Sequence, residues 1–370
     1  MRMKLIAVVM KDAGSFNAVM PAGELLSANG GHDYGCVYFA SGVAATKLKE
    51  RDIPYQNADE FVGDSFDLVL CGTSSTADGD FLERDICRKA TAKGIPIVAI
   101  SDVWMSALRL KDDAVKLTVV TSIDQQSTSL LRQVMPGVKI VTTGNPAFDQ
   151  WFHGQNQYTT NRSAIRERLG LHPKEKLVCF FGGYGDQSAD ILQLLCDTLG
   201  DIGSPYLAFA VRNHPAILQN PKWAKDKAKI EATLADFFGR TVDTAEYKTG
   251  ESLLPAADLC VANWSTLLLQ ATHLVSLHGS PMSLHIILPE YDQGWIANQF
   301  CGLSNTVPAV TLGAAKAVYQ YSPADVATAI SNLLFNENTR HEITRAAKRD
   351  FRLDGRSTER VAAEVIQLLN

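Results

Sequence analysis

The sequence lacks a long apolar run. Nowhere do eighteen apolar residues follow one another, and the N-terminal run from Leu5 to Met10 is shorter than the apolar core of a signal peptide. Both absences predict that the protein has no transmembrane segment and that it stays in the cytoplasm.

Clusters of metal-binding residues are absent as well. The seven cysteines are scattered without a C-x-x-C pair, which is typical of reduced thiols in a protein core. The eight histidines form no H-x-H or H-E-x-x-H motif. We therefore expect neither a structural nor a catalytic metal ion.

An excess of positive charge is missing too. The chain has 35 Lys and Arg against 40 Asp and Glu, a formal net charge of −5, so it lacks the basic footprint of a nucleic-acid-binding protein. The G-x-S-x-G elbow of serine hydrolases and the lysine of a P-loop are also absent. No nucleic-acid partner is expected.

What remains is the composition of an ordinary globular protein, with 46% hydrophobic and 20% charged residues. A chain of 370 residues is too long for one compact core and predicts two domains. The pattern of apolar residues predicts the order of strands and helices in each domain.

Six short apolar runs alternate with helical patterns in the first part of the chain. This alternation predicts a parallel sheet covered by helices on both faces, which is a Rossmann-like domain. Helices are expected at 18–28, 43–51, 81–92 and 122–134, the last with Ser122 as its N-cap. The runs of strand length are 4–9, 34–40, 68–71, 97–100, 117–120 and 139–142.

A second alternation follows a polar, aperiodic stretch at 152–161, which is typical of a linker. Strands are expected at 177–181, 206–211, 259–262 and 286–288, and helices at 162–169, 190–199, 223–238, 323–335, 339–351 and 356–369. The fold class is therefore α/β, with two Rossmann-like domains facing a cleft. We place the N-terminal domain at 1–150, the C-terminal domain at 151–350 and a last helix in 351–370.

Ligands of such folds bind beyond the carboxyl ends of the strands, so the loops after strands are the candidate sites. Gly182, Gly183 and Tyr184 follow a strand and precede a helix, where backbone N–H groups and the helix N-terminus can hold a phosphate. The same glycines can also simply form a tight turn.

Arg212 and His214 end the next strand. An arginine and a histidine there can contact a phosphate or donate a proton, or His214 can cap a carbonyl group. Pro215 follows, and we expect it to stop the strand and to fix the direction of His214.

Asn263, Ser265 and Thr266 follow a third strand and open a leucine-rich helix, for which Ser265 is also a natural N-cap. No Lys or Arg occurs between residues 250 and 315, so a phosphate held there needs hydroxyl, amide or histidine donors. Gln270 lies one helical turn beyond Thr266 and can reach a ribose hydroxyl, or it is only a polar edge residue.

Four aspartates follow strands of the first domain: Asp12, Asp78, Asp80 and Asp102. Each can serve as a general base or as a helix cap. Asp102 is our preferred base, because an apolar strand delivers it beside Trp104.

The segments Thr142–Pro146, Arg212–Pro215 and Ser265–Thr266 resemble motifs of the GT-B superfamily. This superfamily contains glycosyltransferases, UDP-N-acetylglucosamine 2-epimerases and CDP-glycerol polymerases. The segment from Asp354 to Arg360 is also similar to the one before their last helix, which crosses back onto the first domain. Many members carry a glutamate where this chain has Gln270.

The resemblance implies a metal-independent glycosyltransferase that uses a nucleotide-activated sugar as donor substrate and an unknown acceptor, with no further cofactor. Gly182, Gly183, Ser265 and Thr266 would hold the donor diphosphate, Arg212 or His214 would stabilise the leaving group, and Asp102 would deprotonate the acceptor. A 2-epimerase or hydrolase of the same fold and a non-catalytic two-lobed binding protein are the alternatives. A homodimer is compatible with the sequence.

Overall fold

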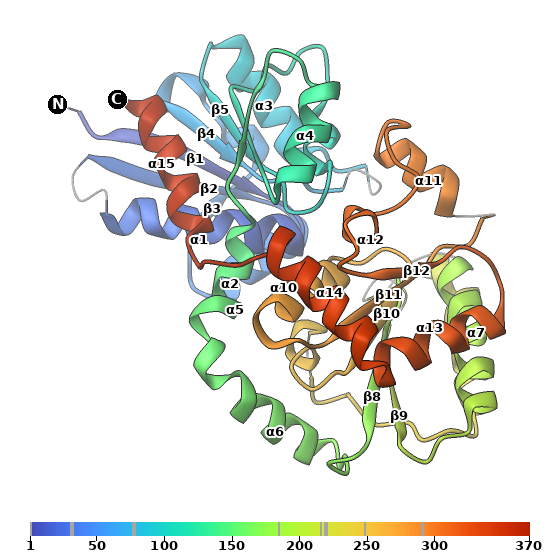
Figure 1. Ribbon diagram of the computed structural model, residues 1–370. Coiled ribbons are helices and arrows are strands. Elements are labelled where there is room, and N and C mark those ends of the chain that lie inside the picture. Colours follow the sequence, from blue (N-terminus) through green and yellow to red (C-terminus); the bar gives the residue numbers. More distant parts are fainter. Residues whose placement is uncertain are drawn as a thin grey trace. The chain divides into compact units, whose positions relative to one another are not determined.

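The computed structural model describes residues 2–29, 33–75, 79–183, 186–214, 217, 221–247, 249–289 and 292–370. The chain divides into two compact units. The first unit comprises Met1–His153 and Leu353–Asn370, and the second comprises Gly154–Arg352. Figure 1 shows the elements of both.

The first unit contains a seven-stranded parallel sheet in the order β3-β2-β1-β4-β5-β6-β7. Its central strands are buried apolar runs, which is why the sequence pattern identified them. The two-residue β3 was too short to predict. The strands are β1 (Lys4–Met10), β2 (Tyr34–Ala40), β3 (Tyr55–Gln56), β4 (Leu68–Cys71), β5 (Ile97–Ile100), β6 (Val119–Ser122) and β7 (Lys139–Thr142).

Two helix starts in this unit differ from the prediction. The Asp12 carboxylate accepts the Ser15 N–H at 2.8 Å, so α1 begins five residues before the expected 18. Asp124 rather than Ser122 caps α4, because β6 extends through Ser122. The helices are α1 (Ala13–Asn29), α2 (Gly42–Glu50), α3 (Leu82–Ala92), α4 (Gln125–Val134), α5 (Asp149–His153) and α15 (Ser357–Leu369), with 3₁₀ turns at Ala58–Glu60, Gly63–Ser65, Ser106–Leu110 and Pro146–Phe148.

The last helix packs into the first unit, as predicted. Val361, Val365 and Leu369 lie on one face of α15 and are buried in the core of this unit. The helix lies beside α1 (Figure 1). Asp149 caps it by accepting the N–H groups of Ser357 at 3.1 Å and Thr358 at 2.8 Å.

The second unit contains a five-stranded parallel sheet in the order β12-β11-β10-β8-β9. The strand expected at 286–288 lies earlier, and β12 was not predicted. The strands are β8 (Lys176–Phe181), β9 (Leu207–Arg212), β10 (Leu259–Ala262), β11 (Met282–Ile286) and β12 (Lys316–Val318). The α/β class with two parallel sheets is thus confirmed.

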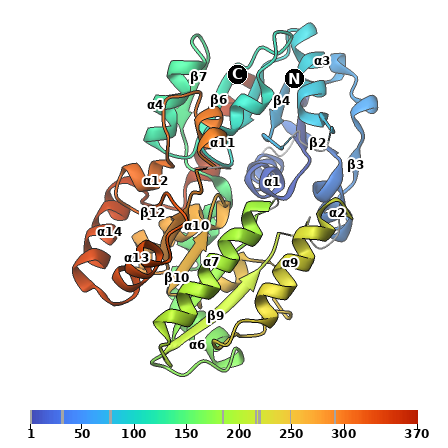
Figure 2. The same ribbon diagram turned by 90° about the vertical axis from the view of Figure 1, so that its right-hand side faces the viewer.

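Helices flank this sheet, and α7 and α9 lie side by side (Figure 2). α10, whose residues are mostly buried, packs against α14. The helices are α6 (Tyr158–Arg168), α7 (Asp186–Ile202), α9 (Ala224–Ala235), α10 (Thr266–His278), α11 (Asp292–Gln299), α12 (Pro308–Thr311), α13 (Pro323–Phe335) and α14 (Glu337–Asp350), with 3₁₀ turns at Gln155–Gln157, Pro221–Trp223 and Glu251–Leu253.

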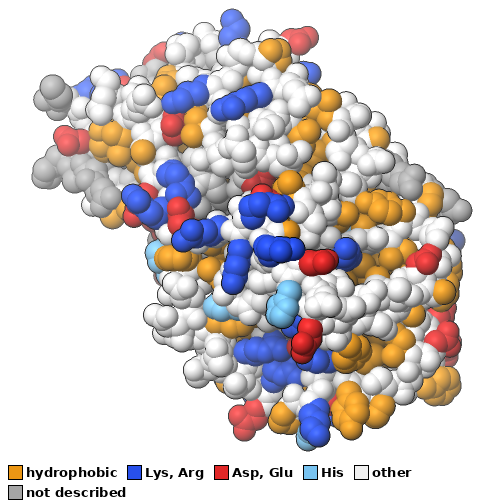
Figure 3. Space-filling view, in the orientation of Figure 1, with side chains coloured by type: hydrophobic (Ala, Val, Ile, Leu, Met, Phe, Trp, Pro, Cys, Tyr) orange, Lys and Arg blue, Asp and Glu red, His pale blue; other side chains and the backbone are white. Residues whose placement is uncertain are grey.

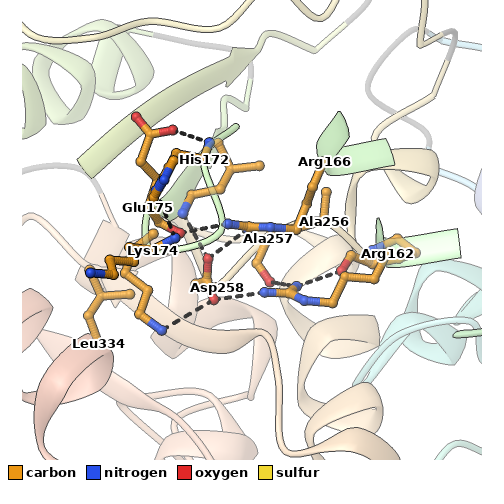
Figure 4. Close-up of polar contacts among 12 residues, drawn as sticks. Arg162, Arg166, His172, Lys174, Glu175, Ala256, Ala257, Asp258 and Leu334 are labelled. Carbon is orange, nitrogen blue, oxygen red and sulfur yellow. Dashed lines mark hydrogen bonds and ion pairs between the residues drawn. The ribbon is translucent and has the colours of Figure 1, made fainter. Parts of the chain in front are cut away.

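Helix α6 begins inside the stretch that we expected to be an aperiodic linker. The residues that anchor this helix recur every four positions, but two of them are arginines. A search for apolar residues at helical spacing therefore does not detect them. The Tyr158 ring stacks on His278 at 3.7 Å. Arg162 and Arg166 donate to the buried carboxylate of Asp258 at 2.8 and 3.0 Å (Figure 4). These contacts tie α6 to the amino end of β10.

Charges of both signs lie close together on the face shown in Figure 3, in keeping with the small net charge. Arg356 and Glu359 form one exposed ion pair, at 2.8 Å. Of the helices in the described part of the chain, none is both long and apolar enough to cross a bilayer.

Candidate functional site

The order of strands defines one switch point in each sheet, where successive connections leave in opposite directions. In the second unit it lies between β8 and β10, and in the first between β1 and β4. Ligands of open α/β sheets bind outside the carboxyl ends of the strands at such points. Of the loops chosen from the sequence, those after β8 and β10 border the switch point of the second unit, and the loop after β9 follows the strand next to β8.

Gly182 and Gly183 follow β8 at this switch point. The Gly182 N–H donates to the Arg212 carbonyl at 2.9 Å, so this N–H continues the sheet and is already engaged. A β-carbon at position 182 would lie 2.9 Å from Ser188 Oγ, and one at position 183 would lie 3.4 Å from Asn263 Oδ1. The loop therefore approaches polar side chains closely. Tyr184 lies outside the described residues.

Arg212 is the last residue of β9 and is half-buried, with Nη1 3.4 Å from the Thr244 carbonyl. His214 is exposed, and its carbonyl accepts the Ile217 N–H at 3.0 Å. Pro215, which we expected to orient His214, lies outside the described residues. Asn213 between them was not singled out from the sequence. Its Oδ1 would lie 3.2 Å from a β-carbon on Gly182.

Asn263 and Ser265 lie in the connection between β10 and α10. Ser265 is the N-cap of α10, since its side chain accepts the Leu267 N–H at 3.2 Å, and Thr266 is the first helical residue. Gln270 is only 5% exposed, and α10 is buried around it. The Asn263 carbonyl accepts a hydrogen bond from His285 at 3.0 Å.

His285 on β11 is a residue that sequence analysis passed over. Burial lowers its pKa to about 4, so the ring is neutral at physiological pH. Because Nδ1 faces a carbonyl oxygen, it carries the ring proton, and Nε2 is an acceptor. A histidine between Leu284 and Ile286 in a buried strand is the sequence signal that could have identified it.

Three buried polar atoms along this edge have no hydrogen-bond partner among the described residues: Ser188 Oγ, Asn213 Oδ1 and His285 Nε2. We call them the orphan atoms. An unpaired buried polar group costs about 1–3 kcal/mol, so such atoms point to missing partners. Ser188 Oγ and Asn213 Oδ1 both approach Gly182, and His285 contacts the Asn263 carbonyl after β10. Two of the three are acceptors and suit ligand hydroxyl groups.

The switch point of the first unit holds a second polar cluster. Asp12 follows β1, and its carboxylate accepts the N–H groups of Ser15 at 2.8 Å and Ser75 at 3.0 Å. Asp12 is therefore a helix cap whose two oxygens are occupied. Asp80 likewise accepts from Ser41 Oγ at 2.6 Å and the Leu82 N–H at 3.0 Å. Asp78 lies outside the described residues.

Asp102, our preferred base, lies after β5 and is 6% exposed. Its Oδ1 lies 3.0 Å from Thr73 Oγ1, which also lies 3.1 Å from the Ile100 carbonyl. Thr73 has one hydroxyl proton and cannot donate to both oxygens at once. Ser106 Oγ, 2.8 Å from Thr73 Oγ1, is a further hydroxyl of this network.

Burial raises the pKa of Asp102, and the charge of Arg109 opposes this rise. Arg109 Nη1 donates to the Thr73 carbonyl at 2.8 Å, so Thr73 lies between the arginine and the carboxyl group. Met105 in the same loop has a left-handed backbone, with φ of 62°. Such strain outside glycine is common at functional sites.

Trp104 contacts another carboxylate, since its Nε1 donates to Asp124 Oδ2 at 2.6 Å. Within the described residues, no group of three or more His, Cys, Asp or Glu side chains is arranged to hold a metal ion.

The predicted residues thus lie at two separate edges. Gly182, Gly183 and Asn263 lie at the second unit's switch point, with Ser265 and Thr266 at the start of the adjoining α10. Arg212 ends the neighbouring edge strand β9, whereas Asp102 lies in the first unit. Thr73 and Glu83 were missed, although the hydroxyl-rich run after β4 was a signal for the first.

No protein-family model and no curated protein matches the sequence. Solved structures do match the fold. UDP-GlcNAc 2-epimerase from Neisseria meningitidis, bound to UDP-GlcNAc, is 12% identical, with a TM-score of 0.69 over 99% of this chain and 100% of the other. The S. aureus MnaA-UDP structure is 14% identical, with a TM-score of 0.70 over 100% and 97%.

MurG from Acinetobacter baumannii is 13% identical, with a TM-score of 0.61 over 99% of both chains. At these identities the likeness concerns the fold alone. It spans the whole chain and agrees with the two parallel sheets described above. The chain therefore has a GT-B-type fold, in agreement with the resemblance of its short motifs to GT-B motifs.

Proposed function

We propose that the second unit binds a nucleotide-activated sugar and that the protein acts on it as a metal-independent glycosyltransferase. The orphan atoms Ser188 Oγ, Asn213 Oδ1 and His285 Nε2 carry the proposal, because a polyhydroxylated ligand would supply the partners that they lack. Structures of the same fold with UDP-GlcNAc or UDP support this choice of ligand.

The two ends of such a donor suit different parts of the edge. The acceptors His285 Nε2 and Asn213 Oδ1 fit hydroxyl groups of a sugar or ribose. The N-terminus of α10, with Ser265 and Thr266, fits the diphosphate, as does the backbone of Gly183. Arg212 and His214 are the proposed groups for charge on the leaving nucleotide.

Asp102 of the first unit is the proposed base for the acceptor hydroxyl. Burial raises the pKa of Asp102, so its carboxylate binds a proton more strongly than that of an exposed aspartate.

The binding step is tested by thermal shift with UDP, CDP, CMP, GDP and dTDP, each with and without EDTA. A nucleotide that binds only the folded protein raises its Tm. We expect one responder, unaffected by EDTA, whose shift is reduced in Ser188→Ala and His285→Asn and retained in Asp102→Asn. No response at millimolar nucleotide would contradict the proposal and favour a non-catalytic binding protein.

A second candidate, an epimerase or hydrolase of the nucleotide sugar, is favoured by the likeness to the Neisseria 2-epimerase. Incubation of the responding nucleotide sugar without acceptor separates the two. A transferase leaves the donor intact, whereas released nucleotide or an altered sugar in the proton NMR spectrum would establish the second candidate.

A further inference from the structure

Glu83 lies in the first turn of α3 and contacts two other segments of the first unit. Its Oε1 accepts a hydrogen bond from Ser15 Oγ at 3.2 Å and another from Ser74 Oγ. Ser15 belongs to the first turn of α1, and Ser74 belongs to the loop after β4. The side chain is only 3% exposed, so this carboxyl group joins the two segments out of contact with water.

The joined segments are packed very closely. A β-carbon at Gly72 would lie 1.8 Å from Ser15 Oγ, so only glycine leaves room for this hydroxyl to reach Glu83. Asp12 ties the same segments a second time, since its N–H donates to Ser74 Oγ at 3.1 Å and its carboxylate accepts the Ser75 N–H at 3.0 Å.

Both segments also contact Asp102. The loop after β4 carries Thr73, whose hydroxyl lies 3.0 Å from Asp102 Oδ1. The first turn of α1 carries Gly14, where a β-carbon would lie 2.3 Å from Asp102 Oδ2. Each oxygen of the Asp102 carboxyl group therefore contacts one of the two segments that Glu83 joins.

We infer that Glu83 is a positioning residue for Asp102, holding the loop after β4 on the start of α1 through Ser74 and Ser15. The inference rests on the proposed function in one respect, since Asp102 is the base only in that proposal. The contacts themselves are independent of any activity.

The charged and titratable groups around Glu83 make its protonation state important. Asp12, at the start of α1, repels a negative charge on Glu83. Cys71 on β4 interacts electrostatically with Glu83. Cys87 lies one turn further along α3, with its Sγ 3.6 Å from that of Cys71. Lys11 Nζ donates to the carbonyl groups of Ser75 and Asp80, so its charge is held at the backbone of the same loop.

Burial is the largest effect and raises the pKa of Glu83 from 4.5 to about 7. When the two segments separate, the carboxyl group reaches water and regains its ordinary pKa. Separation therefore becomes easier as pH rises from about 4.5 to 7 and is insensitive to pH above that range.

The test is amide hydrogen exchange of the folded full-length protein, resolved at the Asp12 and Ser75 amides, at pH 5 and pH 7.5 and corrected for intrinsic rates. Wild type is compared with Glu83→Gln, Glu83→Ala and, as a matched control, Glu50→Gln at the exposed end of α2. The carboxyl ¹³C shift of Asp102 is titrated in the same four proteins.

In wild type and Glu50→Gln we expect protection at both amides to fall by about tenfold or more between the two pH values. Glu83→Gln keeps an acceptor for both serines but does not titrate, so its protection should stay within about threefold of the wild-type value at pH 5. Glu83→Ala should lose protection by about tenfold at pH 5, and its Asp102 should titrate at higher pH because the Thr73 contact is loosened.

Two results would overturn the inference. One is wild-type protection and an unchanged Asp102 titration in Glu83→Ala. The other is a pH dependence in Glu83→Gln equal to that of wild type. Neither depends on nucleotide binding or turnover, so failure of the proposed function would be seen separately.

Discussion

Gly14 lies against the carboxyl group of Asp102, so closely that a β-carbon at position 14 would be 2.3 Å from Asp102 Oδ2. The first turn of α1 and the loop after β5 meet at this contact. Both segments belong to the carboxyl edge of one sheet. A side chain added at position 14 should therefore displace the carboxyl group of the proposed base, Asp102.

Substituting Gly14 by alanine should destabilise the protein by about 1–3 kcal/mol, because the Asp102 carboxyl group must move out of its hydrogen bonds. Urea unfolding measures the change. Gly200→Ala in α7 is the matched control, since a β-carbon there meets no atom within 4 Å. A helical alanine without a clash should stabilise by about 0.5–1 kcal/mol. Equal effects of the two substitutions would contradict the close contact.

Replacing Thr73 by valine removes the hydroxyl group between Asp102 and the Ile100 carbonyl. We expect a loss of about 1–3 kcal/mol in the free energy of unfolding, since buried oxygen atoms are left without a partner. Thr73→Ser keeps the hydroxyl group and should lose less than half as much. If the two variants unfold at the same urea concentration, the hydrogen bonds do not matter for stability.

Glu83→Gln should change how stability depends on pH. The folded protein retains the Glu83 proton up to about pH 7, whereas the unfolded chain releases it near pH 4.5. Wild-type stability contributed by this group therefore falls across that window and is constant above it. Relative to wild type, Glu83→Gln should gain about 3 kcal/mol between pH 4 and pH 8. A difference between the two proteins that is constant with pH would refute the raised pKa.

His285 should act in the opposite direction. Burial lowers its pKa from 6.5 to about 4, so the unfolded chain binds a proton that the folded protein excludes, and stability is lost as pH falls through this range. Asn at position 285 can still donate to the Asn263 carbonyl but cannot titrate. Compared with wild type, His285→Asn should lose about 3 kcal/mol less between pH 7 and pH 4. Parallel unfolding curves of both proteins over this range would show that His285 is not buried in its neutral form.

Asp149→Ala should loosen α15. The carboxylate caps this helix through the N–H groups of Ser357 and Thr358 and is 5% exposed. Losing such a cap costs about 0.5–2 kcal/mol, which hydrogen exchange within α15 would record as faster exchange. Asp149→Asn keeps one acceptor oxygen and should have an intermediate effect. Unchanged exchange in the alanine variant would show that the apolar face of α15 alone holds the helix.

The alternation of buried runs with helical patterns was sufficient to predict the α/β class. Strands such as β4 and β5 are apolar over their whole length, because both faces of a parallel sheet are covered, and their residues carry that signal locally. The helix expected at 162–169 corresponds to α6, but its first turn escaped prediction. The anchors Tyr158, Arg162 and Arg166 contact His278 and Asp258, which are far away in sequence.

The local apolar pattern was sufficient to predict which loops follow strands, and so to single out Gly182, Asn263 and Asp102. Which side chains surround them was decided only by tertiary structure. Hydrogen bonds such as those of Thr73 to Asp102 and of Ser15 to Glu83 join residues 29 and 68 positions apart. Nothing in the local pattern encodes such pairs, because they depend on the order of strands in the sheet. Burial, which sets the pKa of Glu83 and His285, follows from the same packing.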